Sequence, residues 1–312
     1  MKIQSIAVFQ NHEIPCFCAR DCHIARLQAA YPTARVTWCQ NQSAFMKALP
    51  ETQIALTWEF RQEWFAHAPL LRRLATPAAG RDFFAITPPP PVKMLYGSFH
   101  GPLMAETVLG LMLAFNRGVL EAYRRQLAGE LWPRAALTDV RLLRGSHAVI
   151  VGFGHIGTAI ARQLKAFGVR VTGVRRTPPK RRPPWFGKND EQVVLGRLDE
   201  VLPEADHLIL VLPSDTGTDR LIDAARLARL PRHAVVYNVG RGNCLDEAAL
   251  AKALKSGALR GACLDVFAQE PLTKASPLAE NLPGLIRLPH SSAFSEMYMD
   301  RFLDEVIEWL DK

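Results

Sequence analysis

Short apolar runs alternate with amphipathic segments along most of the chain, a pattern that is typical of α/β proteins. In the first hundred residues the predicted strands are 3–9, 34–38 and 54–58, and the predicted helices between them are 21–30 and 43–49. Four consecutive prolines at 88–91 can continue neither a helix nor a central strand, so they predict an extended connector. Together these features predict a small α/β unit with a parallel sheet.

A long segment at 103–120 is apolar on most faces, and its only charges are Glu106 and Arg117, so it predicts a buried helix. Beyond it the predicted strands are 147–151, 169–174, 207–212, 234–239, 261–267 and 285–288, and the predicted helices are 155–167, 219–230, 246–256 and 296–310. Gly168 and Gly257 stand where two of these helices should stop. Strands and helices that alternate in this way predict a second parallel sheet.

The composition is that of a globular protein, with 48% hydrophobic and 22% charged residues in 312. A net charge of +8 suits a protein that binds polyanions and equally an enzyme that acts on acidic metabolites. The sequence carries no RNA-binding module and no zinc finger, so we expect no nucleic-acid partner.

The N-terminal run 1–9 has no basic leader and no small-residue cleavage site, which predicts a first strand rather than a signal peptide. No stretch approaches the ~20 apolar residues of a membrane helix, so we expect a cytoplasmic protein without membrane contact.

Three of the six cysteines lie close together near the N-terminus. Cys16, Cys18 and Cys22 lie beside His12 and His23, which raises the alternative of a metal site. Their spacing is not Cys-x-x-Cys and no second pair follows, so we expect free thiols and no metal.

A glycine-rich turn is the first motif that indicates a ligand. Gly152, Gly154 and Gly157 have the G-x-G-x-x-G spacing, between the strand 147–151 and the helix 155–167. Such glycines allow a tight turn, close approach of a pyrophosphate to the backbone, and close packing of helix on strand. The helix adds free N–H groups and a positive dipole end. A glycine-rich turn without a ligand is the alternative, but the strand–turn–helix context favours a dinucleotide site.

The residue after the second strand of this motif bears on which dinucleotide is bound. NAD-specific sites place an acidic residue there to bind the ribose hydroxyls. Here the strand 169–174 is followed by Arg175, whose guanidinium can bind a 2′-phosphate. We therefore predict NADP as the preferred cofactor, with NAD second; the alternative is that Arg175 is merely exposed. Lys180, Arg181 and Arg182 extend the basic stretch within the proline-rich loop 178–184, which we interpret as a loop beside the cofactor rather than a nucleic-acid patch.

Three further motifs follow the glycine-rich turn in the sequence. They are Asn238-Val-Gly-Arg-Gly-Asn-Cys-Leu-Asp246, Gly261-Ala-Cys-Leu-Asp-Val-Phe-Ala-Gln-Glu-Pro-Leu272 and Pro289-His-Ser-Ser-Ala293. These segments and their order resemble the D-isomer-specific 2-hydroxyacid dehydrogenase family. With the glycine motif the resemblance covers roughly half the chain, 103–295, and 79–82 and 105–106 match more loosely. It implies an NAD(P)-dependent oxidoreductase acting on 2-hydroxy or 2-oxo acids.

The resemblance also implies catalytic roles. Arg241 stands at the position that binds the substrate carboxylate and 2-oxo oxygen, and its planar fork suits that contact. His290 stands at the acid/base position, and Glu270 at the position that pairs with it, where a carboxylate favours the protonated imidazole. Asp265 stands at the position that holds the nicotinamide carboxamide. Taken singly these residues could be a structural histidine, a turn cap and a surface arginine, but their joint occurrence at strand ends favours catalysis.

The cofactor residues expected in this way are Gly152, Phe153, Gly154, His155, Ile156, Gly157, Arg175, Arg176, Thr177, Leu212, Pro213, Thr218, Val239, Gly240, Asp265 and Ser292. For the substrate, the resemblance adds backbone N–H groups of the loop 76–80, with Ala78 and Ala79 as candidates besides Arg241 and His290. Phe294, in place of the smaller residue of many relatives, is expected to narrow the substrate pocket.

The expected fold is two Rossmann-like α/β domains. A doubly wound cofactor domain, 101–294, is inserted into a smaller flavodoxin-like substrate domain made of 1–100 and 295–312. The helix at 103–115 is expected to serve a homodimer contact, as the family's layout implies.

The predicted reaction is reduction of a small 2-oxo acid, of the glyoxylate or hydroxypyruvate type, to the (R)-2-hydroxy acid with NADPH. The alternatives are an NAD(P)-sensing, corepressor-like interaction protein without significant turnover, a phosphoglycerate dehydrogenase-like enzyme, and a formate or phosphite dehydrogenase. The full set of Arg241, Glu270 and His290 weighs against the sensor, and the end of the chain directly after its last helix weighs against the long form of phosphoglycerate dehydrogenase.

Overall fold

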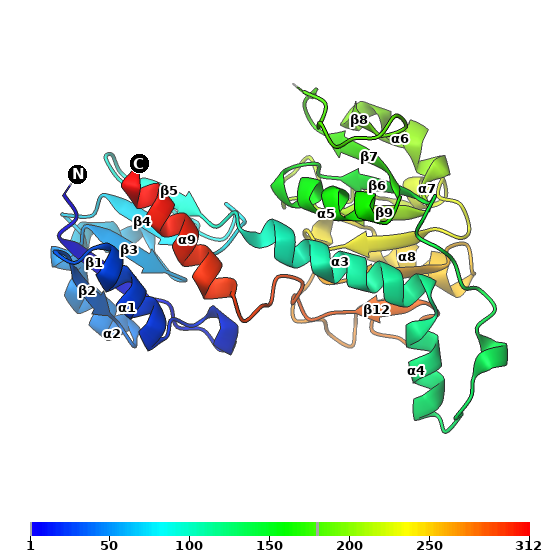
Figure 1. Ribbon diagram of the computed structural model, residues 1–312, viewed down its shortest axis with the longest axis horizontal. Coiled ribbons are helices and arrows are strands. Elements are labelled where there is room, and N and C mark those ends of the chain that lie inside the picture. The colour runs from blue at the N-terminus through cyan, green and yellow to red at the C-terminus, as the bar shows by residue number, and fades with distance from the viewer. Residues whose placement is uncertain (1, 179–180) are drawn as a thin grey trace. The chain divides into compact units, whose positions relative to one another are not determined.

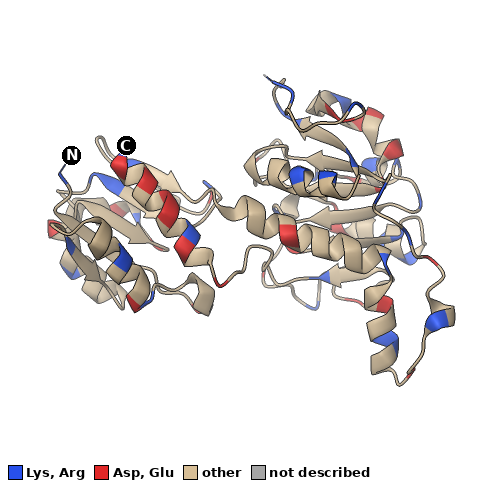
Figure 2. Cartoon of the chain, viewed as in Figure 1, with Lys and Arg blue, Asp and Glu red and all other residues tan. Residues whose placement is uncertain are grey.

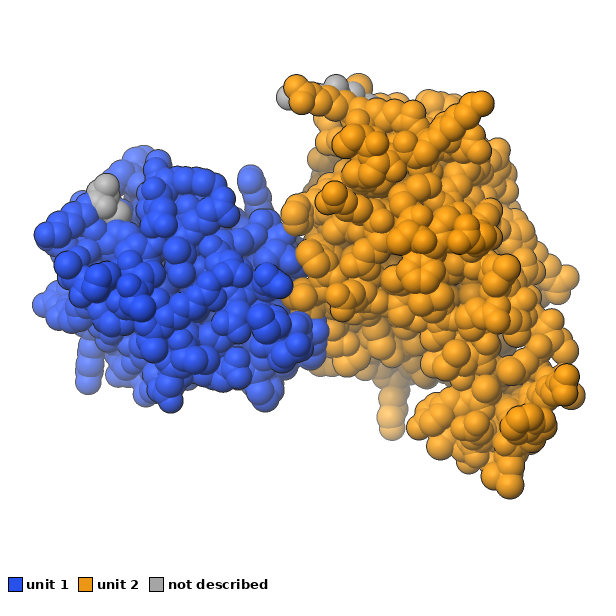
Figure 3. Space-filling model, viewed as in Figure 1, with its two compact units in different colours: residues 1–100, 294–312 blue, residues 101–293 orange. Residues whose placement is uncertain are grey.

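The computed structural model describes residues 2–178 and 181–312, which form two compact units (Figure 1 and Figure 3). Unit 1 comprises residues 1–100 and 294–312, and unit 2 comprises residues 101–293. The predicted boundary differs at Phe294, which belongs to unit 1 because its ring packs against Phe17 with centroids 5.0 Å apart. Pro179 and Lys180 of the predicted basic loop lie outside the described residues.

Unit 1 is built on a five-stranded parallel sheet with the order β2-β1-β3-β4-β5, which is the flavodoxin-like order. Its strands are β1 Ser5–Phe9, β2 Arg35–Trp38, β3 Ile54–Thr57, β4 Arg73–Thr76 and β5 Lys93–Tyr96. Its helices are α1 Asp21–Ala30, α2 Gln42–Ala48 and α9 Tyr298–Asp311, with 3₁₀ turns at η1 Pro15–Phe17, η2 Leu49–Glu51 and η3 Gln62–His67. The buried side chains of β1 and β3 lie in parallel register, with Ile6 opposite Ile54, and they form the centre of the core.

Unit 2 is built on a seven-stranded parallel sheet with the order β12-β11-β10-β9-β6-β7-β8. Its strands are β6 His147–Val151, β7 Arg170–Arg175, β8 Glu191–Val194, β9 His207–Leu210, β10 Val235–Asn238, β11 Gly261–Leu264 and β12 Leu285–Arg287. Its helices are α3 His100–Asn116, α4 Val119–Leu127, α5 His155–Ala166, α6 Leu198–Val201, α7 Ala224–Leu227 and α8 Glu247–Lys255. Its 3₁₀ turns are η4 Arg134–Ala136, η5 Leu195–Arg197, η6 Leu202–Glu204 and η7 Gly242–Cys244.

Helices cover both faces of the unit 2 sheet, as the alternation of side chains along β6 shows. Ala148 and Ile150 pack in one core cluster with residues of α3 and α5, which lie in front of the sheet in Figure 1. Val149 and Val151 point to the other face and pack with residues of α6, α7 and α8. The order and the two covered faces are those of a doubly wound fold, so the predicted α/β fold with two Rossmann-like sheets is confirmed.

Several predicted elements differ from the structure. The helix expected at 219–230 shrinks to α7, because Arg220 has a φ of +45°, Ile222 pairs with Leu245 as a β-bridge, and the Asp223 carboxylate caps the helix that starts after it. The helix expected over 103–120 is interrupted at Gly118, which has a φ of +67°.

The buried residues of the helix α3 lie in the core of its own unit, and the dimer contact expected for this helix stays a prediction. Met104, Val108 and Met112 pack with the sheet residues Ala148 and Ile150. These side chains are therefore unavailable to a second chain.

The described residues contain no single helix with the length and hydrophobicity to cross a membrane; α3 and α4 meet those criteria only together, and they are bent by 69° at their junction. Charged residues of both signs are spread over the helices and loops of both units, and acidic residues recur along α9 (Figure 2).

Candidate active site

The turn between β6 and α5 has the shape that the glycine motif predicts. Gly152 has a φ of +99°, and a Cβ there would clash with the carbonyl oxygen of Val211. Gly157 packs directly on the carbonyl oxygen of Gly152, which brings α5 against the turn. Gly154 is the N-cap of α5 and has open space where a Cβ would stand. The first turn of α5 carries no acidic residue, so its N–H groups and dipole remain available to an anion.

The three other residues of this turn are placed differently from one another. Phe153 is 4% exposed, its ring packs against Gly173 of β7, and its N–H donates to the carbonyl oxygen of Val174 at 3.0 Å. Ile156 packs against the same core cluster, whereas His155 is exposed at the first position of α5. The Phe153 side chain therefore belongs to the core, and a place for Phe153 in the cofactor site stays a prediction.

The predicted phosphate-binding arginines lie at the end of β7. Arg175 is the last residue of the strand, and its guanidinium lies 3.5 Å from Oε1 of Gln192. Arg176 and Thr177 are exposed, and Arg176 forms an ion pair with Asp215 at 2.5 Å. The Arg176 guanidinium holds the pKa of the Asp215 carboxyl below its usual value. Sequence reasoning missed Asp215, because no local pattern brings a loop residue after β9 beside the end of β7.

The remaining predicted cofactor residues follow neighbouring strands. Leu212 and Pro213 come after β9, and Thr218 is buried with its hydroxyl donating to the carbonyl oxygen of Pro213 at 2.8 Å. Val239 and Gly240 come after β10, where a Cβ on Gly240 would crowd the backbone of Leu212. Since all seven strands are parallel, these loops lie at the carboxyl edge of the sheet, together with the glycine turn and Arg175.

The side chains of His290 and Glu270 form the pair that the family resemblance implies. Nδ1 of His290 lies 2.8 Å from Oε2 of Glu270, and the side chains are 53% and 35% exposed. The other oxygen of Glu270 accepts the N–H of Phe267 at 2.9 Å, so the carboxylate is held from both sides. His290 has a φ of +55°, and its N–H donates to the carbonyl oxygen of Asp265 at 2.9 Å.

Asp265 supports the loop that carries His290. Its carboxylate is 1% exposed and accepts the N–H groups of Ser291 at 2.6 Å and Ser292 at 2.9 Å. The predicted cofactor residue Ser292 is buried, and its carbonyl oxygen accepts a hydrogen bond from Thr107. This arrangement fixes the backbone on both sides of the imidazole.

Arg241 follows β10 in a tight loop. Asn238 braces that loop, since its side chain donates to the carbonyl oxygen of Arg241 at 3.0 Å and accepts the N–H of Gly240 at 3.1 Å. Arg241 is half-buried, and its guanidinium donates to the carbonyl oxygen of Gly240 at 3.0 Å. Gly242 packs so closely on the backbone of Phe267 that no Cβ would fit. The loops of Arg241 and Glu270 therefore lie against each other.

In unit 1, the predicted substrate loop follows β4. Ala78 is buried and its N–H lies 3.3 Å from the hydroxyl of Thr76, whereas Ala79 is exposed. Within the described residues, the N–H groups of Ala79 and Gly80 have no hydrogen-bond acceptor. The N–H of Gly97 donates to the carbonyl oxygens of Thr76 and Ala78, which holds the loop in place.

The cysteines and the rest of the basic loop have other surroundings. All six cysteines are free thiols, and the described part of the chain holds no group of three potential metal ligands. Arg181 is exposed, whereas Arg182 donates to the carbonyl oxygens of Gly187 and Asp190 and lies over the ring of Phe186. Arg182 therefore stabilises the loop in which it lies.

Comparison with known proteins identifies the family. Residues 109–292 match the model of the D-isomer specific 2-hydroxyacid dehydrogenase, NAD binding domain. Glyoxylate/hydroxypyruvate reductase B of Pectobacterium carotovorum is 35% identical over 236 residues, which cover 73% of this chain and 71% of that protein. A D-isomer specific 2-hydroxyacid dehydrogenase family protein from Aeromonas salmonicida has a TM-score of 0.78 at 32% identity, covering 99% of this chain and 96% of its own. The NADPH-dependent glyoxylate/hydroxypyruvate reductase from Sinorhizobium meliloti, solved with NADP and sulfate, has a TM-score of 0.78 at 25% identity, covering 99% and 95%. The chain therefore belongs to the D-isomer-specific 2-hydroxyacid dehydrogenase family and is an NAD(P)-dependent oxidoreductase.

Proposed function

We propose that this enzyme reduces a small 2-oxo acid of the glyoxylate or hydroxypyruvate type to the (R)-2-hydroxy acid, with NADPH as the preferred reductant. The observation that carries the proposal is the 2.8 Å bond between Nδ1 of His290 and the carboxylate of Glu270. It joins an imidazole to a carboxylate at the carboxyl edge of a doubly wound sheet, where such folds bind their ligands. Relatives named as glyoxylate/hydroxypyruvate reductases support the substrate type.

The pair of His290 and Glu270 supplies the proton. Reduced nicotinamide, when bound, delivers a hydride to the carbonyl carbon, so the carbonyl oxygen must gain a proton. Glu270 accepts the bond from Nδ1, which leaves Nε2 of His290 to protonate that oxygen. In the reverse direction the neutral imidazole takes the proton of the hydroxyl group. Asp265, by fixing the backbone of Ser291 and Ser292, keeps the imidazole in position, and its remaining lone pairs can accept from the cofactor carboxamide.

Arg241 binds the substrate carboxylate in this proposal. A guanidinium presents a planar fork of donors that matches a carboxylate, and the brace of Asn238 limits its freedom. The N–H groups of Ala79 and Gly80 are the second set of donors, and they are better placed than that of Ala78, which faces the Thr76 hydroxyl.

The residues present fit a dinucleotide. A side chain at Gly152 or Gly157 would clash with backbone, while the space over Gly154 is open at the N-terminus of a helix of 12 residues. These are the properties that a pyrophosphate needs. At the end of β7, Arg175 and Arg176 offer two guanidinium groups to a 2′-phosphate, and charge-assisted bonds of this kind contribute about 1.5–3 kcal/mol each.

The reaction is tested by absorbance at 340 nm with NADPH and a panel of 2-oxo acids, followed by chiral analysis of the product. His290→Asn should lower kcat by about 10²–10⁴-fold, because it removes the proton donor while asparagine tolerates a positive φ. The matched control is His67→Asn, an exposed histidine of unit 1, which should leave kcat unchanged. Near-normal turnover by His290→Asn, or no oxidation of NADPH with any 2-oxo acid, would overturn the proposal.

Cofactor preference is tested by kcat/KM for NADPH and NADH. Replacement of Arg175 by Gln should lower the value for NADPH by about tenfold to a hundredfold and change that for NADH little, because only NADPH carries the 2′-phosphate. Arg229→Gln, which changes an exposed arginine of unit 2 outside the predicted cofactor residues, is the control. Equal losses with both cofactors would contradict the role of Arg175.

We also propose that the enzyme is a homodimer, and the support lies in residues 119–142, called the arm below. α4 and the segment after it extend away from the unit 2 sheet in Figure 1. The large exposed apolar side chains of the arm are Val119, Leu120, Tyr123, Leu127, Leu131, Trp132, Val140 and Leu142. Exposed apolar patches of this kind mark interaction sites.

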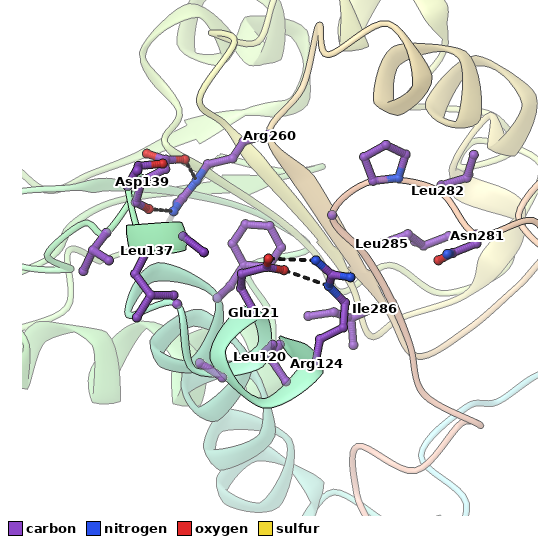
Figure 4. A pocket seen from close by; sticks show the side chains of 18 residues that line it. Leu120, Glu121, Arg124, Leu137, Asp139, Arg260, Asn281, Leu282, Leu285 and Ile286 are labelled. Atoms are coloured by element: carbon purple, nitrogen blue, oxygen red, sulfur yellow. Dashed lines mark hydrogen bonds and ion pairs between the residues drawn. The ribbon is translucent and has the colours of Figure 1, made fainter. Parts of the chain in front are cut away.

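A cavity of about 580 Å³ lies at the base of the arm, between the end of α3 and residues 281–286 (Figure 4). Leu285 and Ile286 contribute apolar surface, and the ion pairs of Glu121 with Arg124 and of Asp139 with Arg260 also lie there. A second copy brings an identical apolar arm to this cavity, where Leu285 and Ile286 offer apolar contacts, and such reciprocal contacts are what a symmetric dimer requires.

Light scattering coupled to size exclusion tests the dimer. The double variant Leu131→Ser/Trp132→Ser should run as a monomer, whereas Leu70→Ser, which changes a large apolar side chain of unit 1 that is 46% exposed, should remain dimeric. A monomeric wild type, or a double variant that is still dimeric, would refute the arm as the interface.

A further inference from the structure

A cluster of aromatic side chains lies at the carboxyl edge of the unit 1 sheet. We call Phe17, Trp58, Phe83, Phe294 and Tyr298 the aromatic edge. Trp58 is its centre, with ring centroids 5.2 Å from Phe17, 5.7 Å from Phe83 and 6.1 Å from Tyr298. Phe17 in turn contacts Phe294 at 5.0 Å and Tyr298 at 4.4 Å. Segments far apart in the sequence therefore meet in one apolar surface.

The fold explains why this surface lies beside the substrate loop. Trp58 directly follows β3, and Phe83 lies in the loop after β4, which also contains Ala79 and Gly80. Parallel strands end at the same edge of a sheet, so both loops occupy the carboxyl edge of unit 1. The N–H of Phe83 donates to the carbonyl oxygen of Gly80 at 3.2 Å, which holds Phe83 next to the proposed carboxylate donors.

The exposure of these rings distinguishes the surface from an ordinary core. Tyr298 is 3% exposed, but Phe83 is 47% and Phe294 is 37% exposed. The indole N–H of Trp58 already donates to the carbonyl oxygen of Phe17 at 2.8 Å, so the indole has no donor left for a substrate hydroxyl. Phe83 meets Trp58 at 67°, edge to face, which leaves apolar ring surface beside the substrate loop.

We propose that the aromatic edge binds the side chain of the substrate and that the enzyme accepts 2-oxo acids with aromatic side chains, such as phenylpyruvate, with lower KM than hydroxypyruvate. The proposal rests on the proposed reduction of 2-oxo acids and extends it to larger, apolar side chains. A carboxylate held by Ala79 and Gly80 places the substituent at C3 toward Phe83. A phenyl ring there gains apolar burial and an aromatic contact that a hydroxyl group cannot make.

The experiment compares kcat and KM for glyoxylate, hydroxypyruvate and phenylpyruvate, with NADPH in excess. We expect KM for phenylpyruvate to be about tenfold below that for hydroxypyruvate, which corresponds to the upper range of one aromatic contact. Phe83→Ala should remove most of this advantage by raising KM for phenylpyruvate, with a smaller effect on its kcat, because the contact is made before and during hydride transfer alike.

Two further variants keep the test sharp. Phe83→Leu keeps most of the apolar volume, so it should retain part of the lower KM for phenylpyruvate. A variant that only disturbs the fold would instead change KM and kcat equally for all three acids. Phe167→Ala, at the end of α5 and 37% exposed, is the matched control and should leave the KM ratio at the wild-type value. A wild-type KM for phenylpyruvate equal to or above that for hydroxypyruvate, or an unchanged KM ratio in Phe83→Ala, overturns the inference while leaving the proposed reaction intact. Absence of turnover with all three acids overturns both.

Discussion

His207 makes the stability of unit 2 depend on pH, and the size of the effect follows from its burial. It is the first residue of β9 and is 3% exposed. Its polar neighbours, the Asn116 amide at 3.5 Å and the Tyr237 hydroxyl at 3.4 Å, lie at the limit of hydrogen-bond distance. Burial, assisted by the positive charge of Arg260, lowers the pKa of His207 from 6.5 to about 4. The imidazole is therefore neutral in the folded protein at pH 7.

The sign of the dependence follows from linkage. Between the folded pKa of about 4 and the unfolded pKa of 6.5, the unfolded chain binds more protons at this site than the folded one, so stability falls as the pH falls. At 1.36 kcal/mol per pKa unit the full difference is about 3 kcal/mol, of which about 2 kcal/mol is lost between pH 7 and pH 5. Burial and the nearby Arg170 also lower the pKa of His147, which acts in the same direction.

Urea unfolding of the wild type and of His207→Gln at pH 7 and pH 5 measures the effect. The substitution has a constant cost at both pH values, so the difference between the two proteins isolates the titration of this one group. The wild type should lose about 2 kcal/mol more than the variant on acidification. His207→Asn provides a second non-titrating side chain if glutamine folds poorly. Stability curves that run parallel between pH 7 and pH 5 would refute the reasoning.

Three other outcomes are expected. Gly152→Ala should weaken NADPH binding, measured by fluorescence titration, and lower the melting temperature, because Gly152 has a φ of +99° and a Cβ there would clash with backbone atoms. The control Gly110→Ala should leave the melting temperature no lower than that of the wild type, because there is open space at that position. Asp215→Asn frees Arg176 from its ion pair and should tighten NADPH binding about threefold, with unchanged affinity arguing against a phosphate contact. Asp190→Asn removes a carboxylate that is 1% exposed and 2.8 Å from a lysine ammonium, and it should lower the free energy of unfolding by about 3 kcal/mol; a loss below about 1 kcal/mol would contradict the importance of this pair.

The sequence predicted the elements that carry strong periodicity. β6 and α1 have the predicted bounds, and the helix α8 differs from its prediction by one residue at each end. Gly168 and Gly257 have φ values of +72° and +67°, which confirms them as helix stops. In each case local chemistry and tertiary packing favour the same structure.

The missed elements lack such a local signal. β4, β5 and β8 are strands of four residues whose identity depends on pairing with neighbours far along the chain. The segment before α7 has a helical pattern, yet its bridge between Ile222 and Leu245 outweighs the intrinsic preference.

The candidate site shows the same division. The family resemblance implied the pair of His290 and Glu270, and the structure brings these two residues together. Asp215 beside Arg176 and Phe83 against Trp58 were not predicted, because no motif of the sequence includes Asp215, Phe83 or Trp58. The sequence also could not show that Phe153 turns into the core, since that depends on the space that Gly173 leaves in the next strand.

At His290 stability and activity favour different residues, because the left-handed backbone conformation suits glycine whereas the proposed reaction needs an imidazole. A residue with a side chain is destabilised by about 1–2 kcal/mol in this conformation, and the contacts of Asp265 with the loop keep it in place. Glycine would relieve the strain but cannot transfer a proton. A laboratory selection for heat resistance alone would therefore favour loss of the imidazole, and engineering of a more robust enzyme has to screen for activity at every round.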